Sequence, residues 1–125
     1  MDPTLTVLVV DDEPTNLSTF NRAFRKDFKV LTALSGAEAL ELLEREAVDV
    51  LLVDYRMPRM DGLEVLAAAR ARWPRAVRAL LTAHADAPGL CDAQRDGLCA
   101  AVLAKPWSHD ALLAWVRRAA AERAP

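Results

Sequence analysis

The segment Val50-Leu51-Leu52-Val53-Asp54 joins four consecutive apolar residues to one carboxylate. An apolar run without alternation is typical of a strand that is buried on both faces of a sheet. Three other apolar runs in the chain also end in polar side chains. Those polar ends are Asp11-Asp12, Thr82 and Lys105. The repeated pattern predicts parallel strands whose carboxyl ends carry the chemistry of the protein.

Five such runs alternate with segments of helical period. We predict strands over residues 6–10, 28–33, 49–53, 77–82 and 100–104. The signals for helix starts between them are Pro14, Ser35 with Glu38, Asp61 with Glu64, Pro88 and Ser108. A fivefold βα repeat predicts an α/β fold with one parallel sheet and helices on both faces. In the flavodoxin-like, doubly wound form of this architecture, the five strands have the order 2-1-3-4-5.

The composition excludes several classes of protein. The chain has 125 residues, of which 53% are hydrophobic, and a net charge of −2. This is about one domain, and its charge does not favour direct binding of nucleic acid. No apolar run approaches the roughly 20 residues of a membrane span, and residues 1–4 lack the basic start of a signal peptide. Cys91 and Cys99 form neither a disulfide framework nor a metal-binding pattern, so we expect a cytoplasmic protein.

The predicted strand order brings distant polar residues to one edge of the sheet, because the carboxyl ends of strands 1, 3, 4 and 5 then lie side by side. The side chains at these ends are Asp11, Asp12, Asp54, Thr82 and Lys105. Crowded carboxylates repel one another, and a hard cation such as Mg²⁺ relieves the repulsion. The set therefore predicts a site for Mg²⁺ and a phosphoryl group. For each acid taken alone, a plainer interpretation stays open, in which Asp12, for example, only caps a helix.

With these motifs in order, the chain resembles the receiver domain of two-component response regulators, the CheY-like family. The matching pieces are residues 9–14, 54–58, 61–62 and 81–83, Gly97 and Lys105-Pro106. Each piece is weak alone, but together they are specific. The resemblance covers about residues 5–119 and implies a single receiver domain over residues 1–125.

The resemblance implies a phosphoacceptor with a metal site. Asp54 is expected to take a phosphoryl group from a histidine of a sensor histidine kinase or a phosphotransfer protein. The Mg²⁺ ligands are expected to be Asp11, Asp12, Asp54 and the backbone carbonyl of Arg56. The only chemistry expected is self-phosphorylation and autodephosphorylation, so the domain is expected to signal and not to act as an enzyme.

The resemblance also implies a switch. Thr82 is expected to hydrogen-bond to the phosphoryl group, and Lys105 to pair first with Asp54 and then with the phosphoryl group. The Lys105–Pro106 peptide bond is expected to be cis. Phosphorylation is expected to shift the surface made by the fourth helix, the fifth strand and the fifth helix. That surface would control an output, and a homodimer through it is a family expectation.

Two positions depart from the family. Val102 stands three residues before Lys105, where most receivers have Tyr or Phe. We expect Val102 to be an ordinary buried strand residue and the switch to be carried elsewhere. Trp107 stands where Phe is commoner, and we expect it to pack in the core. A Lys-Pro-Trp sequence also resembles receivers that are fused to output domains, such as cyclic-di-nucleotide phosphodiesterases or activators of σ54-type transcription.

Arg56 and His84 lie two positions after Asp54 and Thr82, where the family tunes the lifetime of the acyl phosphate. For His84, a histidine in a surface loop is the plainer interpretation. The other charged residues have plain interpretations only. His109 is expected to be a surface residue. A solvated face is expected for the run Arg70, Arg72, Arg75 and Arg78.

Two alternatives come from other functional classes. A dehalogenase-like phosphatase would use an acid pair after the first strand, with Glu13 as the second acid, but it would need a cap domain. A pseudo-receiver would act as an interaction module without phosphorylation, and the presence of Asp54, Thr82 and Lys105 disfavours it. The first residue, Met1, suggests an N-terminal domain, and an effector domain beyond Pro125 stays open.

Overall fold

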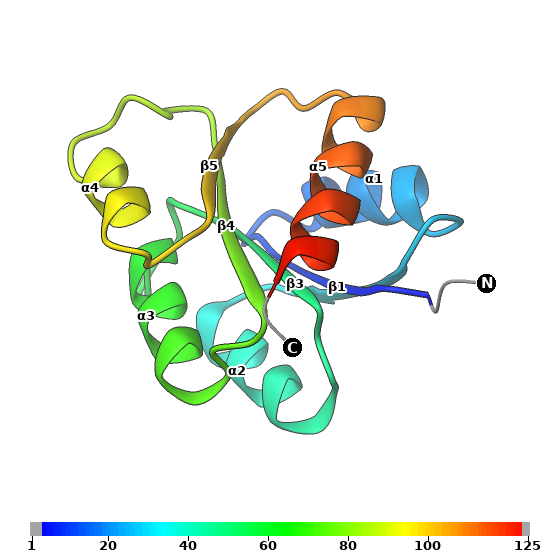
Figure 1. The fold of residues 1–125 in the computed structure, drawn as a ribbon, viewed down its shortest axis with the longest axis horizontal. Coiled ribbons are helices and arrows are strands. Elements are labelled where there is room, and N and C mark those ends of the chain that lie inside the picture. Colours follow the sequence, from blue (N-terminus) through cyan, green and yellow to red (C-terminus); the bar gives the residue numbers. More distant parts are fainter. Residues whose placement is uncertain (1–3, 124–125) are drawn as a thin grey trace.

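In the computed structural model, residues 4–123 are described and form one five-stranded sheet with five helices (Figure 1). The strands are β1 (Thr6–Val10), β2 (Lys29–Ala33), β3 (Val50–Asp54), β4 (Val77–Thr82) and β5 (Ala101–Ala104). The helices are α1 (Pro14–Phe24), α2 (Gly36–Arg45), α3 (Gly62–Arg72), α4 (Leu90–Arg95) and α5 (His109–Glu122). All pairings are parallel, in the order β2-β1-β3-β4-β5. The predicted fold is confirmed; the predicted domain limits at residues 1 and 125 lie outside the described residues.

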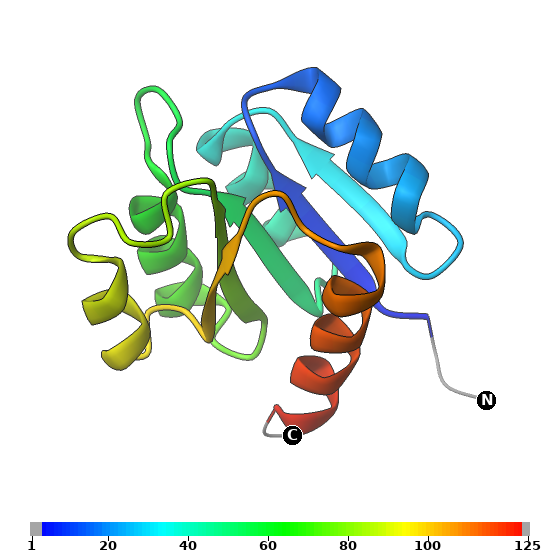
Figure 2. The same ribbon diagram turned by 90° about the horizontal axis from the view of Figure 1, so that it is seen from above.

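The helices form two layers, one on each face of the sheet. Helices α2, α3 and α4 cover one face, and α1 and α5 cover the other (Figures 1 and 2). Successive strand residues point to opposite faces, so Leu51 packs with the first layer and Leu52 with the second. This double burial is why the strands are continuously apolar and do not alternate.

Most helix starts follow the predicted signals. Pro14 opens α1, and Ser35 and Ser108 accept the capping hydrogen bonds of α2 and α5. Asp61 and Glu64 form a reciprocal capping box at the start of α3. At α2 the box is incomplete, because the Glu38 carboxylate accepts from the backbone N–H of Leu34 and not from that of Ser35.

The predicted start of α4 at Pro88 is wrong by two residues. Gly89 lies between Pro88 and the helix with φ of +89°, a left-handed conformation that glycine adopts without strain. The chain therefore turns at Gly89 before α4 begins at Leu90. At the other end, α4 stops at Arg95, and Gly97, two residues later, has φ of +80°, a left-handed conformation typical of the residue after a helix end.

Arg78 ties the end of α4 to the start of β4. Its guanidinium donates to four backbone carbonyls, at distances of 3.0–3.2 Å. These belong to Leu98, Gly97, Pro74 and Ala76. Burial lowers the pKa of Arg78, with a further lowering from Arg70. A solvated face is therefore wrong for Arg78, although Arg72 and Arg75 are exposed as expected.

Aromatic rings join α1 to the start of α5. Trp107 lies 5.7 Å from Phe20 and 5.3 Å from Phe24 between ring centroids, so its predicted place in the core is confirmed. His109 stacks on Phe24 with centroids 4.7 Å apart, and its Nε2 lies 3.1 Å from Asp27 Oδ2. His109 is thus more than the plain surface residue that we expected.

Within residues 4–123, every helix is too short or too polar to cross a membrane.

Candidate functional site

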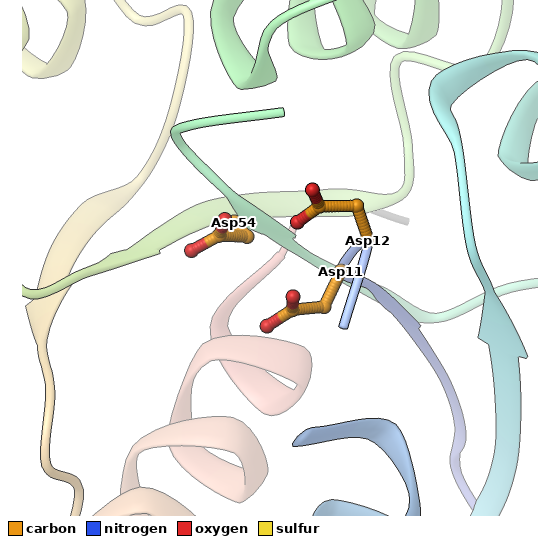
Figure 3. Close-up of side chains that lie close together, drawn as sticks. All are labelled: Asp11, Asp12 and Asp54. Carbon is orange, nitrogen blue, oxygen red and sulfur yellow. The ribbon is translucent and has the colours of Figure 1, made fainter. Parts of the chain in front are cut away.

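Three carboxylates meet at the carboxyl edge of the sheet. Asp11 and Asp12 follow β1, and Asp54 is the last residue of β3. Strands β1 and β3 are neighbours, with Val10 opposite Val53, so the three acids emerge side by side (Figure 3). One oxygen from each carboxylate lies within 4.8 Å of the others. The convergence expected from the strand order is therefore present.

Lys105 supplies the positive charge of the cluster. Its Nζ lies 2.9 Å from Asp54 Oδ1 and 3.1 Å from Asp11 Oδ2. The residue follows β5, and its backbone N–H donates to the carbonyl of Thr82 at 2.9 Å, which fixes the loop to the end of β4. The following peptide bond to Pro106 is cis, as predicted.

Burial and charge act on Asp54 in opposite directions. Burial of the carboxyl raises the pKa of Asp54, Lys105 lowers it, and the charges of Asp11 and Asp12 raise it again. The net pKa of Asp54 lies above its ordinary value of 3.8. Burial alone lowers the pKa of Lys105, but the hydrogen bonds to Asp54 and Asp11 outweigh it and raise that pKa above 10.5. A cation placed among these acids would therefore favour the ionised form of Asp54.

Thr82 ends β4, the strand next to β3, and is 2% exposed. Its Oγ1 accepts a hydrogen bond from the backbone N–H of His84 at 2.9 Å. The hydrogen bond ties the Thr82 hydroxyl to the β4–α4 loop. Strand β4 itself lies between β3, which carries Asp54, and β5, which carries Val102. Val102 packs against the layer of α2, α3 and α4 as a strand residue, but it is half-buried and not buried as we expected.

Gly62 permits the start of α3 to lie against the end of β3. A Cβ atom at this position would lie 2.7 Å from the carbonyl oxygen of Asp54 and 2.9 Å from Cα of Tyr55. The Gly62 N–H donates to the carbonyl of Tyr55 at 2.9 Å. A side chain here would push on the backbone that carries Asp54, so the Asp61-Gly62 pair supports the site as well as the helix.

Arg56 lies in the β3–α3 loop, with an exposed side chain. It lines a shallow surface depression together with Tyr55, Met57, Pro58 and Asp61. His84 is likewise exposed. The carbonyl oxygen of Arg56 stays a predicted metal ligand.

Sequence reasoning missed Asn16. Its side-chain Nδ2 donates to Asp11 Oδ2 at 3.1 Å, from the first turn of α1. The same residue lines a cavity of about 550 Å³ beside the site, together with Asp11, Phe20, Lys105 and Trp107. The available signal was a polar residue five positions after Asp11, in the first turn of the helix that Pro14 opens.

The cluster has the composition of a site for a hard cation. Its candidate ligands are carboxylate oxygens, which Mg²⁺ and Ca²⁺ prefer over nitrogen or sulfur. Within residues 4–123, one ammonium, that of Lys105, contacts two of the three carboxylates, so the acids outnumber the cation. An anionic group such as a phosphoryl would be repelled unless further positive charge were present.

The comparisons with known proteins agree on one family. A family model described as "Response regulator receiver domain" matches residues 7–117. The hydrogenase transcriptional regulatory protein HoxA of Cupriavidus necator is 38% identical over 118 residues, which are 94% of this chain and 24% of that protein. The transcriptional regulatory protein GlrR of Escherichia coli is 37% identical over 120 residues, 95% of this chain and 27% of its own. This chain thus spans about a quarter of the length of these relatives.

A solved structure agrees in fold and in sequence. The crystal structure of a response regulator receiver domain protein from Clostridium thermocellum has a TM-score of 0.86 and 28% identity. The match covers 94% of both chains.

Proposed function

This chain belongs to the response regulator receiver family, and from that premise we propose that it accepts a phosphoryl group on Asp54. The observation that carries the proposal is the position of Lys105 Nζ, 2.9 Å from Asp54 Oδ1 and 3.1 Å from Asp11 Oδ2. An ammonium beside the acceptor carboxylate can shift its contact from the carboxylate to the phosphoryl oxygens when the phosphoryl group is transferred. Phosphoryl transfer asks a protein mainly for such positioning and charge neutralisation.

The carboxylate cluster fits Mg²⁺. Asp11, Asp12, Asp54 and the backbone carbonyl of Arg56 would hold the ion. The support is the all-oxygen set of three carboxylates around a single ammonium, which leaves negative charge for a cation to offset. When bound, Mg²⁺ supplies positive charge that favours an anionic phosphoryl group in the site.

The transfer forms one bond and breaks one. A carboxylate oxygen of Asp54 attacks the phosphorus of a phosphohistidine on a sensor kinase or a phosphotransfer protein. The phosphorus–nitrogen bond breaks, and the imidazole keeps its electron pair. The product is an acyl phosphate on Asp54, and Lys105 turns from the carboxylate to the new phosphoryl oxygens. Water later cleaves the acyl phosphate, and neither reaction makes the domain an enzyme that acts on a separate substrate.

Phosphorylation then biases the β4–α4 loop. The Thr82 hydroxyl would donate to a phosphoryl oxygen, while it now accepts from His84 N–H in that loop. A shift of Thr82 would therefore move the backbone before α4 and change the surface of α4, β5 and α5. Because Val102 offers no ring to swing inward, the loop itself carries the switch in this proposal.

The whole protein would use this surface to control an output. The matched relatives are transcriptional regulators about four times as long as this chain, which supports an effector domain outside residues 1–125 and a transcriptional output. We propose a single receiver domain over residues 1–125, with a core over about residues 5–119. In this proposal it works in the cytoplasm, forms a homodimer through the surface of α4, β5 and α5, and leaves contact with nucleic acid to the effector.

Intact-mass analysis with acetyl phosphate tests the proposal. With Mg²⁺, we expect one labile phosphate on the wild type and none on Asp54→Ala, whereas Glu41→Ala, a change at an exposed acid of α2, behaves like the wild type. EDTA should abolish labelling. No modification under any condition would favour a pseudo-receiver. Steady hydrolysis of a phosphoester by Asp54→Ala would favour a phosphatase.

A further inference from the structure

Asn16 makes a direct contact with the buried carboxylate of the cluster. Its Nδ2 lies 3.1 Å from Asp11 Oδ2, and Asp11 is only 4% exposed. An ionised carboxylate has no proton to donate, so the amide nitrogen of Asn16 must be the donor in this contact. The hydrogen bond therefore orients the Asp11 carboxylate.

Three donors together fix the two oxygens of Asp11. Oδ1 accepts from the backbone N–H of Glu13 at 3.0 Å. Oδ2 accepts from both Asn16 and Lys105, each at 3.1 Å. The Lys105 ammonium is shared with Asp54, whereas the Asn16 side chain has no other hydrogen-bond partner within residues 4–123.

We propose that Asn16 is a positioning residue that holds Asp11 in its metal-binding orientation before phosphorylation, and becomes more important once Lys105 turns to the phosphoryl group. The inference rests on the proposed function, because only phosphoryl transfer takes Lys105 away from Asp11. Once that ammonium has moved, Asn16 is the remaining side-chain donor to Asp11 Oδ2. Hydrogen-bonding partners of metal ligands typically contribute 10–100-fold to metal affinity.

The local structure supports a dedicated role. Asn16 is the third residue of α1, two positions after Pro14, and its side chain is otherwise exposed. Asparagine forms helices less well than alanine. Alanine at this position would therefore suit the helix better, so the contact with Asp11 gives the reason for an amide here. It also follows that Asn16→Ala should fold.

The test is a Mg²⁺ titration of wild type, Asn16→Ala and Asn21→Ala, followed by tryptophan fluorescence. Trp107 and Asn16 line the same cavity, so a ring close to the site reports binding. Asn21 is a matched control, because it is an exposed asparagine more than one turn further along α1. We expect the Kd for Mg²⁺ to rise about 10-fold in Asn16→Ala and to stay unchanged in Asn21→Ala.

Two further readouts separate positioning from a structural role. The Tm in EDTA should be nearly the same for all three proteins. Phosphorylation of Asn16→Ala by acetyl phosphate should be slow at limiting Mg²⁺ and return to the wild-type rate at saturating Mg²⁺. An unchanged Kd in Asn16→Ala, with or without a lower Tm, would overturn the inference alone. A wild type that does not bind Mg²⁺ would overturn the proposed function and this inference with it.

Discussion

The ammonium of Lys105 lies 2.9 Å from Oδ1 of Asp54, although 51 positions of sequence separate the two residues. The contact exists because β3, β4 and β5 are consecutive in the sheet and end at the same edge. One ammonium does not balance the three carboxylates there, so the pKa of Asp54 stays raised, first by burial and then by its acidic neighbours. Further positive charge at this site would therefore be favourable. Without a metal ion, the buried and crowded carboxylates lower the free energy of unfolding.

The first prediction concerns that cost. The pKa of Asp54 in the folded protein lies above 3.8, so the folded state binds more protons than the unfolded chain between pH 3.8 and the raised pKa. The free energy of unfolding must then fall as pH rises through this window. Asp54→Asn removes this titration, so in EDTA at pH 7 we expect it to have a higher Tm than the wild type.

Thermal unfolding from pH 4 to pH 7, followed by circular dichroism, checks this expectation. The control is Asn21→Ala, a change at an exposed residue without a titratable side chain, which should leave the pH dependence unchanged. Mg²⁺ should raise the Tm of the wild type more than that of Asp54→Asn. A lower Tm of Asp54→Asn at pH 7 would show that the pair with Lys105 outweighs burial and repulsion.

The second prediction concerns His109. Its carboxylate neighbours Asp110 and Asp27 raise the pKa of His109 above 6.5. The ion pairs with the protonated ring are fully present below pH 6.5 and are lost as pH rises through the raised pKa. An NMR titration of the ring protons should give a pKa above 6.5, and Asp27→Asn should lower it. A pKa at or below 6.5 in the wild type would contradict the contacts seen here.

The third prediction concerns Arg78. Arg78→Met removes donors to four backbone carbonyls in the loops around α4, and we expect it to lower the free energy of unfolding by about 2–3 kcal/mol. Arg75→Met is the control, because Arg75 is exposed and has no ion pair within residues 4–123. It should change stability by less than about 0.5 kcal/mol. Urea unfolding measures both, and equal effects would refute an anchoring role for Arg78.

The fourth prediction concerns Gly62. A Cβ atom there would meet the backbone of Asp54 at 2.7 Å, and backbone cannot move aside cheaply. Gly62→Ala gains about 1 kcal/mol of helix propensity but should lose about 1–3 kcal/mol from overpacking. We expect lower net stability and slower phosphorylation of Asp54.

Gly36→Ala is the matched control for Gly62→Ala. It opens α2 as Gly62 opens α3, but the three atoms nearest to its new Cβ would be side-chain atoms, those of Met60 and Val65. Val65 is fully buried and β-branched, so stability should fall here as well. The backbone of Asp54 is not displaced, so the rate of phosphorylation should stay unchanged. Equal rates for both variants would show that close packing at Gly62 does not position Asp54.

The sequence was enough to predict the strands, their order and the edge where the acids meet. Doubly buried strands require continuous apolar runs, and sheet order then determines which strand ends are neighbours. Other features depend on contacts that no local pattern contains. The charge run around Arg78 looks solvated until the fold brings the carbonyls of Gly97 and Leu98 within its reach.

The start of α4 and the contact of Asn16 with Asp11 depend on local backbone geometry, which the residue types do not determine. Pro88 is a good first residue for a helix, but Gly89 takes a left-handed conformation and delays α4. Asn16 lies on the exposed side of α1, where a polar residue attracts no notice. Its contact with Asp11 depends on how the loop after β1 turns into the helix, which the residue types alone do not specify.

The central claim is that Asp54 becomes an acyl phosphate, and chemical trapping tests it most directly. Borohydride reduces an acyl phosphate to an alcohol, so reduction after treatment with acetyl phosphate and Mg²⁺ should convert Asp54 to homoserine. Tandem mass spectrometry of the resulting peptides locates the change. We predict homoserine at position 54 and at no other acid, and none when EDTA replaces Mg²⁺. Homoserine at Asp11 or Asp12, or an unmodified Asp54 in protein that carries phosphate, would contradict the account.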